Sequence, residues 1–379
     1  MASTEPDHYA RAVPKAPSRG SRWSLGLLLL ALSACAPSSP SATPPEASAK
    51  VSATPSVGSV STASSSAASD AGSAGDAATE AASAAGPAPI TASRARSLMF
   101  LGDPPPEAQP CGEQPDEAAQ IRCLLAVHYR ADKQAAKAAI ALYDEAGTVC
   151  GIEAPRMMDG GWRGMLKLVP HPPVGHNRRH LQWLLAAAAD FNQWFVALHE
   201  DQTARARYRW QPLELRFFRS VGRTTPSAYA DGWTISYNVS GSLHSSDNAV
   251  RETMFHEIFH LNDRDHGNWS ERHLTPIYDS IVARCTNKWR KLNTACLRPF
   301  APHHVMVRGG TYYAFQPGNG VWEYAAELAT RYYFEHREIL AGRSLAKPPF
   351  KCGPQENGQS WKLLVDEFFG GIDRVPPCP

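Results

Sequence analysis

The sequence predicts an α+β fold with a small mixed sheet for the folded part of the chain, residues 96–379. Residues 233–239 alternate between apolar and polar side chains with the period of a half-buried β-strand, and residues 213–218 alternate in the same way. Residues 180–200 and 251–266 instead carry apolar side chains at helical spacing. Both kinds of element occur in one stretch and a mainly helical part follows it, which indicates the α+β class.

The first 35 residues have the features of a bacterial export signal. Basic residues precede an apolar run over residues 25–32, which is too short to span a bilayer comfortably. Leu32-Ser33-Ala34-Cys35 resembles the bacterial lipobox, which implies cleavage before Cys35 and lipidation of that residue. By the same resemblance, Ala36 favours the outer membrane. We therefore expect a cell-envelope lipoprotein anchored in the outer membrane, on its periplasmic or surface face; an ordinary signal peptide or an uncleaved anchor is the alternative.

Residues 36–95 have the composition of a tether. They consist almost entirely of Ser, Ala, Pro, Thr and Gly, with few aromatic or large aliphatic side chains to form a core. We expect a flexible segment that holds the folded domain, residues 96–379, away from the membrane surface.

The charge balance argues against one class of partner. The chain has 38 Lys and Arg against 36 Asp and Glu, a formal net charge of +2, and it contains no long basic block. Proteins that bind nucleic acid neutralise its phosphates with clustered Lys and Arg. We therefore expect no nucleic-acid partner.

The cysteines predict disulfides, because export places them in an oxidising compartment. Setting Cys35 aside leaves 8 − 1 = 7 cysteines: Cys111, Cys123, Cys150, Cys285, Cys296, Cys352 and Cys378. We expect Cys285–Cys296 and Cys352–Cys378, since each pair is close in sequence and isolated from the others. Two of the remaining three are expected to pair and to leave one over. None of the seven has the C-x-x-C spacing of a cysteine zinc site.

Similar patterns predict the helices and the strand that precede residues 213–218. Residues 116–146 begin with acidic residues and continue with Ala, Leu and Lys at helical spacing, which predicts one or two helices. Residues 164–169 read as a strand, and the long apolar helix over residues 180–200 separates them from the strand at 213–218.

The helix over residues 251–266 contains His256-Glu257-Ile258-Phe259-His260, an H-E-x-x-H motif. His256 and His260 are one helical turn apart, so both imidazoles can reach a single ion. Glu257 lies beside that face without having to ligate, which suits a general base that acts on water activated by zinc. The alternative is a pair of core histidines that satisfy each other or the backbone.

A catalytic zinc site needs one further protein ligand, and the sequence offers two candidates. His266 lies six residues after His260, the spacing of a third histidine in metzincins, but Asp263 occupies the position where that pattern has glycine. Glu323 begins a helix that reaches about His336.

Glu327 lies on the same helical face as Glu323, and like charges at this spacing destabilise an isolated helix by about 0.2–0.5 kcal/mol. A zinc site accounts for both carboxylates: Glu323 would bind the ion and Glu327 would accept the outer N–H of a ligating histidine. On a plain solvated helix, Arg331 would neutralise Glu327 instead.

At these residues the chain resembles the gluzincins, and within them the group of anthrax lethal factor and Pro-Pro endopeptidase. The resemblance rests on the H-E-x-x-H motif and on Glu323-Tyr324-Ala325-Ala326-Glu327, and it covers about the C-terminal half of the folded part. It implies a zincin-like two-lobed metallopeptidase domain with Glu323 as third ligand. It also implies an upstream tyrosine that donates to the oxyanion, Tyr313 first and Tyr312 second, although both lie a few residues further upstream than in that group.

Two further expectations come from the same resemblance. Residues 233–239 would present a free strand edge that pairs with the extended substrate, and the alternative is an ordinary sheet strand that binds no ligand. The long interval over residues 262–317, with its two cysteines, would be a disulfide-stapled insertion.

The function that these features imply is a zinc-dependent endopeptidase acting on a peptide or protein substrate, with Zn²⁺ held by His256, His260 and Glu323. Glu257 would act as general base and Tyr313 as oxyanion donor. The alternative is a non-catalytic surface lipoprotein that binds a partner, or that holds a structural zinc with His266 as a fourth ligand.

Overall fold

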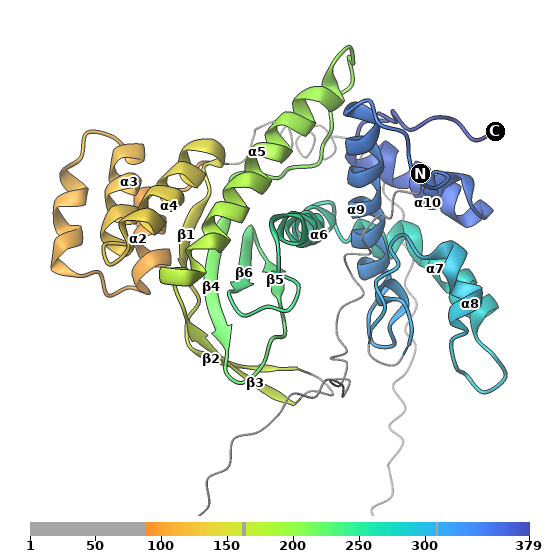
Figure 1. Ribbon diagram of the computed structural model, residues 1–379, viewed down its shortest axis with the longest axis horizontal. Coiled ribbons are helices and arrows are strands. Elements are labelled where there is room, and N and C mark those ends of the chain that lie inside the picture. The colour runs from red at the N-terminus through yellow and green to blue at the C-terminus, as the bar shows by residue number, and fades with distance from the viewer. Residues whose placement is uncertain (1–87, 161–163, 308–309) are drawn as a thin grey trace, which may run out of the picture. The chain divides into compact units, whose positions relative to one another are not determined.

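The computed structural model describes residues 88–160, 164–307 and 310–379, and these residues form an α+β fold (Figure 1). The expected signal peptide, the lipidation of Cys35 and the tether up to residue 87 lie outside the described residues. Helix α2 (Ala92–Phe100) begins slightly before residue 96, where the composition placed the start of the folded domain, and the side chain of Thr91 caps its first turn.

The helices and strands are as follows. The helices after α2 are α3 (Glu117–His128), α4 (Lys133–Ala146), α5 (Arg179–His199), α6 (Asp247–Asp265), α7 (Trp269–Cys285), α8 (Thr294–Leu297), α9 (Val321–Leu340) and α10 (Gln355–Phe368). The strands are β1 (Val149–Ile152), β2 (Arg156–Asp159), β3 (Met165–Pro170), β4 (Glu214–Ser220), β5 (Ala228–Asp231) and β6 (Thr234–Asn238). The helices expected around residues 116–146, 180–200 and 251–266 are thus confirmed within a few residues, as are the strands.

The strands form one mixed sheet in the order β2-β3-β4-β6-β5, with β1 also pairing with β4. β4 runs parallel to β6 and to β1, whereas β3 and β5 are antiparallel to their neighbours. Strand β6 is therefore paired on both sides. The expectation that residues 233–239 present a free edge is wrong, and β5 is the edge strand on this side of the sheet.

Helix α6 lies between the sheet and the C-terminal helices. Figure 1 shows it nearly end-on, with β5 and β6 on one side and α9 on the other, and it packs against α5 as well. Its first turn is capped by Ser246, whose hydroxyl accepts from the backbone N–H of Ala249. Arg251 of α6 and Arg337 of α9 both approach the Asp190 carboxylate of α5, so one acidic group ties three helices together.

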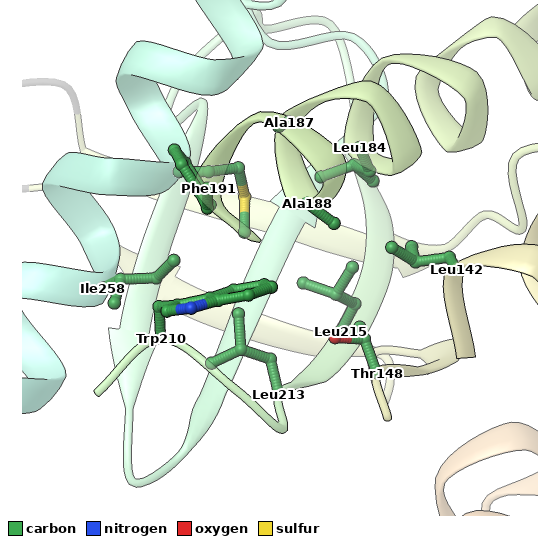
Figure 2. A pocket seen from close by; sticks show the side chains of 11 residues that line it. Leu142, Thr148, Leu184, Ala187, Ala188, Phe191, Trp210, Leu213, Leu215 and Ile258 are labelled. Carbon is green, nitrogen blue, oxygen red and sulfur yellow. The ribbon is translucent and has the colours of Figure 1, made fainter. Parts of the chain in front are cut away.

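One face of α6 is part of the apolar core. Met254 and Ile258 are buried and face a narrow apolar space between α5 and the sheet. Figure 2 shows the Trp210 ring lying across this space, with Phe191 of α5 close by. Burial of this face fixes the direction of the other face, which carries His256 and Glu257.

The disulfides agree with the expected pairing. Cys285–Cys296 and Cys352–Cys378 are both present, and the third bridge joins Cys111 to Cys123. Cys150 is the one left over, and its thiol is buried in β1.

After α6, the regular elements that the structure describes are all helices, and loops join them. Helix α7 continues from α6 through a short turn, and α7 packs on α9. Within the described ranges, no helix is both long and apolar enough to cross a membrane.

Candidate metal centre

The centre of the site is formed by two turns of α6 and the first turn of α9. The Nε2 atoms of His256 and His260 lie 3.2 Å apart. Oε2 of Glu323 lies 3.0 Å from Nε2 of His256 and 3.6 Å from Nε2 of His260. All three ligand atoms lie within 4.8 Å of one another. The predicted ligands thus converge although Glu323 is far from the histidines in the sequence.

Glu327, one turn after Glu323, reaches the other nitrogen of His256. Its Oε1 lies 3.5 Å from Nδ1 of that ring. Burial and the charge of Glu323 raise the pKa of Glu327 to about 7, although the charges of His256 and His260 oppose the shift. Arg331 does not neutralise Glu327, because its Nε donates to Glu335 at 2.7 Å.

Glu257 and Tyr313 lie in the wall of a cleft beside the three ligands. The cleft has a volume of about 1200 Å³, part of which is open solvent, and His256, Glu257, Tyr313 and Glu327 all line it. Burial raises the pKa of Glu257, an effect that His256 and His260 oppose. A carboxylate whose pKa is raised in this way is better suited to accept and return a proton near neutral pH.

Of the two candidate tyrosines, only Tyr313 lines the cleft. It begins a 3₁₀ turn over Tyr313–Phe315, and its ring centroid lies 5.9 Å from that of His256. Burial and the nearby charges of Glu323 and Glu257 hold its pKa well above the ordinary value, so its hydroxyl keeps its proton and can donate. Tyr312 is buried next to His304 instead, with ring centroids 5.7 Å apart.

The competing ligand, His266, is directed elsewhere. Its Nδ1 lies 2.6 Å from Oε1 of Glu367 in α10, and its ring packs on Phe368. The direction of His266 is explained by Asp263, which occupies the position where the metzincin pattern has glycine. Helix α6 continues through this residue to Asp265, and the Asp263 carboxylate accepts from both the backbone N–H and the hydroxyl of Ser270. The sharp turn that would bring His266 to the ion is therefore absent from α6.

The charges of the site match the requirements of a divalent cation. Three carboxylates act on the His256 imidazole, those of Glu323, Glu327 and Glu257, and a fourth, that of Glu252, lies in the same cleft wall. Among the described residues that line the cleft, none is a lysine or arginine. Burial lowers the pKa of His256, but the hydrogen bond with Glu323 and the other carboxylates outweigh it and raise the pKa to about 9. Two imidazole nitrogens and one carboxylate oxygen are a donor set that zinc accepts, so these residues fit the ion.

Glu252 is the residue in this set that the sequence analysis did not identify. It lies in the cleft wall one turn before His256, its Oε2 atom is buried and lacks a hydrogen-bond partner, and burial raises its pKa to about 8. The spacing of Glu252, His256 and His260 on one helical face was the available signal. His303 is a second cleft residue that was missed, because nothing in the sequence places the segment after α8 beside α6.

The edge strand β5 also reaches the cleft. Ala228, the first residue of β5, lies in the cleft wall together with Pro226 and Ser227 just before it. Arg264 of α6 donates to Asp231 at the other end of the strand, at 2.9 Å. The site helix and the free strand edge are thus held side by side.

Comparison of the chain with protein families, with curated proteins and with solved structures finds no match in any of the three.

Proposed function

We propose that this protein is a zinc-dependent endopeptidase of the gluzincin type with a zincin-like fold. The observation that carries the proposal is the convergence of His256, His260 and Glu323, because His256 also lines an open cleft together with Glu257. A site that opens on a cleft leaves room for substrate, whereas a structural zinc site is closed by a fourth protein ligand. His266, the expected fourth ligand of such a closed site, is paired with Glu367.

The chain's own residues divide the chemistry between them. When bound, zinc supplies a Lewis acid that lowers the pKa of water and polarises a carbonyl oxygen. Glu257 accepts the proton from the attacking water and passes it to the leaving amine. Tyr313 donates its hydroxyl proton in a hydrogen bond to the oxygen on which negative charge develops. Glu327 orients the His256 ring and keeps Nε2 available to the ion.

Strand β5 supports a peptide as the substrate. An extended peptide can add to a free strand edge through backbone hydrogen bonds, and β5 carries such an edge into the cleft. The apolar side chains of Leu243 and Met306 line the same cleft and are partly exposed, so they offer contacts to apolar side chains of that peptide.

The proposal is tested by incubating the zinc-loaded full chain with a peptide library and identifying cleavage sites by mass spectrometry. We expect cleavage by the wild type and none by Glu257→Gln, which preserves the shape of the side chain but cannot accept the proton. A variant that cleaves as fast as the wild type would rule out Glu257 as the base. Absence of cleavage by both proteins would favour the alternative, a lipoprotein that binds a partner without catalysis.

The location of the enzyme is proposed from the sequence alone. A lipid on Cys35 would anchor the chain in the outer membrane, and residues 36–87 would separate the catalytic domain from it.

A further inference from the structure

A short loop between α7 and α8 carries the most conspicuous exposed side chain of the C-terminal helical region. Trp289 is 72% exposed, and no contact described above for the candidate metal centre involves it. Lys288, Arg290 and Lys291 surround it in sequence, and all three are exposed as well. We call residues 286–292 the tryptophan loop. In Figure 1 it projects from the ends of α7 and α8, away from the sheet.

The tryptophan loop is held in one conformation by its own chain. The Cys285–Cys296 disulfide closes its base, and Thr286 and Leu292 form a β-bridge above it. At the tip, the Asn287 side chain accepts from the backbone N–H groups of Trp289 and Lys291, at 2.9 and 3.0 Å. The loop is therefore already ordered in the unbound protein, and this reduces the entropic cost of binding a partner.

The turn displays a cation where glycine is the usual residue. Arg290 has φ of 58°, in the left-handed region that side chains other than those of Gly, Asn and Asp seldom adopt. The backbone N–H of Arg290 closes the turn on the carbonyl of Asn287 at 2.9 Å. An arginine at this position is unfavourable for the fold, which indicates that its charge has another use.

The cations of the tryptophan loop form no ion pair with the acidic side chains that the structure describes. Lys288 lies with its ammonium 5.3 Å from the centre of the Trp289 ring. Within the described part of the chain, Lys288, Arg290 and Lys291 have no acidic partner. The tip thus combines one exposed indole with three cations that pair with no described carboxylate.

From this combination we infer that the tryptophan loop binds the surface of an anionic phospholipid membrane. Indole rings favour the interface between headgroups and acyl chains, and adjacent Lys and Arg are attracted by anionic headgroups. The tryptophan loop suits a protein partner less well than a membrane. Specific protein interfaces bury roughly 800 Å² on each side, much more than the surface of one tight turn. Single-stranded nucleic acid is bound by several stacking aromatics along a basic groove, and here there is one indole. The inference does not depend on the proposed peptidase activity.

The test measures co-sedimentation of the full chain with vesicles, with Cys35→Ser in every protein so that lipidation cannot contribute. The vesicles are phosphatidylcholine alone and phosphatidylcholine mixed with phosphatidylglycerol. We expect tighter binding to the anionic vesicles, weakening as salt is added. Lys288→Ala/Lys291→Ala should bind them about 25-fold less tightly, since each cation contributes about fivefold at low salt.

Two single variants separate charge from shape. Arg290→Gly removes a cation but suits the turn, so it should lose about fivefold in vesicle affinity without loss of thermal stability. Trp289→Ala should lose about tenfold in vesicle affinity and should also lose the quenching of tryptophan fluorescence by brominated lipid that we expect of the wild type. The matched control, Lys133→Ala/Lys137→Ala, removes two exposed cations from α4 and should bind as the wild type does.

Three results would overturn the inference. The first is equal binding of neutral and anionic vesicles by the wild type. The second is a loss of affinity in the α4 control as large as in Lys288→Ala/Lys291→Ala, which would make the effect one of net charge. The third is binding of a single-stranded oligonucleotide that depends on Trp289, combined with no binding to vesicles.

Discussion

Oε1 of Glu327 lies 3.5 Å from Nδ1 of His256, while Nε2 of the same ring faces Glu323 at 3.0 Å. One helix, α9, therefore contacts both nitrogens of a single imidazole. The contact with Glu323 places the proposed third ligand beside the ring, and the contact with Glu327 orients the ring and favours a proton on Nδ1.

This arrangement predicts the effect of removing the outer carboxylate. Glu327→Ala should lower zinc affinity by about 10–100-fold, because the His256 ring loses the group that orients it. Competition with a chelator of known affinity measures the change. The control is Glu338→Ala, which removes a carboxylate from a more exposed position of α9, where it pairs with Arg343. Equal affinities for Glu327→Ala and Glu338→Ala would remove Glu327 from the account.

Tyr313 is expected to act only on the rate of the chemical step. Tyr313→Phe should lower kcat by about 10²–10³ with little change in KM, since the hydroxyl stabilises charge that develops in the transition state. Tyr312→Phe is the matched control, because its ring packs beside His304 outside the cleft lining. A larger loss in Tyr312→Phe than in Tyr313→Phe would reverse the assignment of the two tyrosines.

The sequence was sufficient for the parts of the site that lie on one periodic element. His256, Glu257 and His260 follow from the spacing on α6, because burial of Met254 and Ile258 on the other face fixes their direction. Glu323 could be proposed only by resemblance, since no local pattern shows that α9 lies against α6. The Cys285–Cys296 and Cys352–Cys378 disulfides were likewise predictable from the spacing of the cysteines alone.

The edge of the sheet could not be read from the sequence. β5 is only Ala228–Asp231, too short for an alternating pattern, and it precedes β6 in the chain while lying outside it in the sheet. The free edge was therefore predicted at β6, whose alternating pattern is the clearer of the two. Glu252 was missed because its role depends on its burial beside Glu327, which only the packing of α6 on α9 creates.

Two buried histidines that contact Tyr237 of β6, His180 and His244, predict that the stability of the fold depends on pH. Nδ1 of His180 lies 2.9 Å from the Tyr237 hydroxyl, and the His244 ring stacks on Tyr237 with centroids 3.8 Å apart. Burial lowers the pKa of His180 to about 4 and that of His244 to about 3. Because the unfolded chain binds protons from about pH 6.5 downward and the folded chain does not, their contribution to stability is lost as pH falls from 6.5 toward these values.

The measurement is the free energy of unfolding at pH 7 and pH 4.5, obtained by urea denaturation. We expect each imidazole to contribute about 1–3 kcal/mol to the decrease. His244→Phe keeps the stacked ring but cannot be protonated, so the decrease should be smaller in this variant. His273→Phe, at an exposed position of α7, is the control and should resemble the wild type. The same decrease in His244→Phe as in the wild type would contradict the argument.

The central claim is that Glu323, and not His266, completes a zinc site with His256 and His260. It is tested most directly by elemental analysis of zinc in the wild-type chain, in Glu323→Ala and in His266→Ala. The account predicts about one equivalent of zinc in the wild type and in His266→Ala, and loss of the ion in Glu323→Ala. Zinc that is lost only in His266→Ala, or a wild-type protein that binds none, would contradict it.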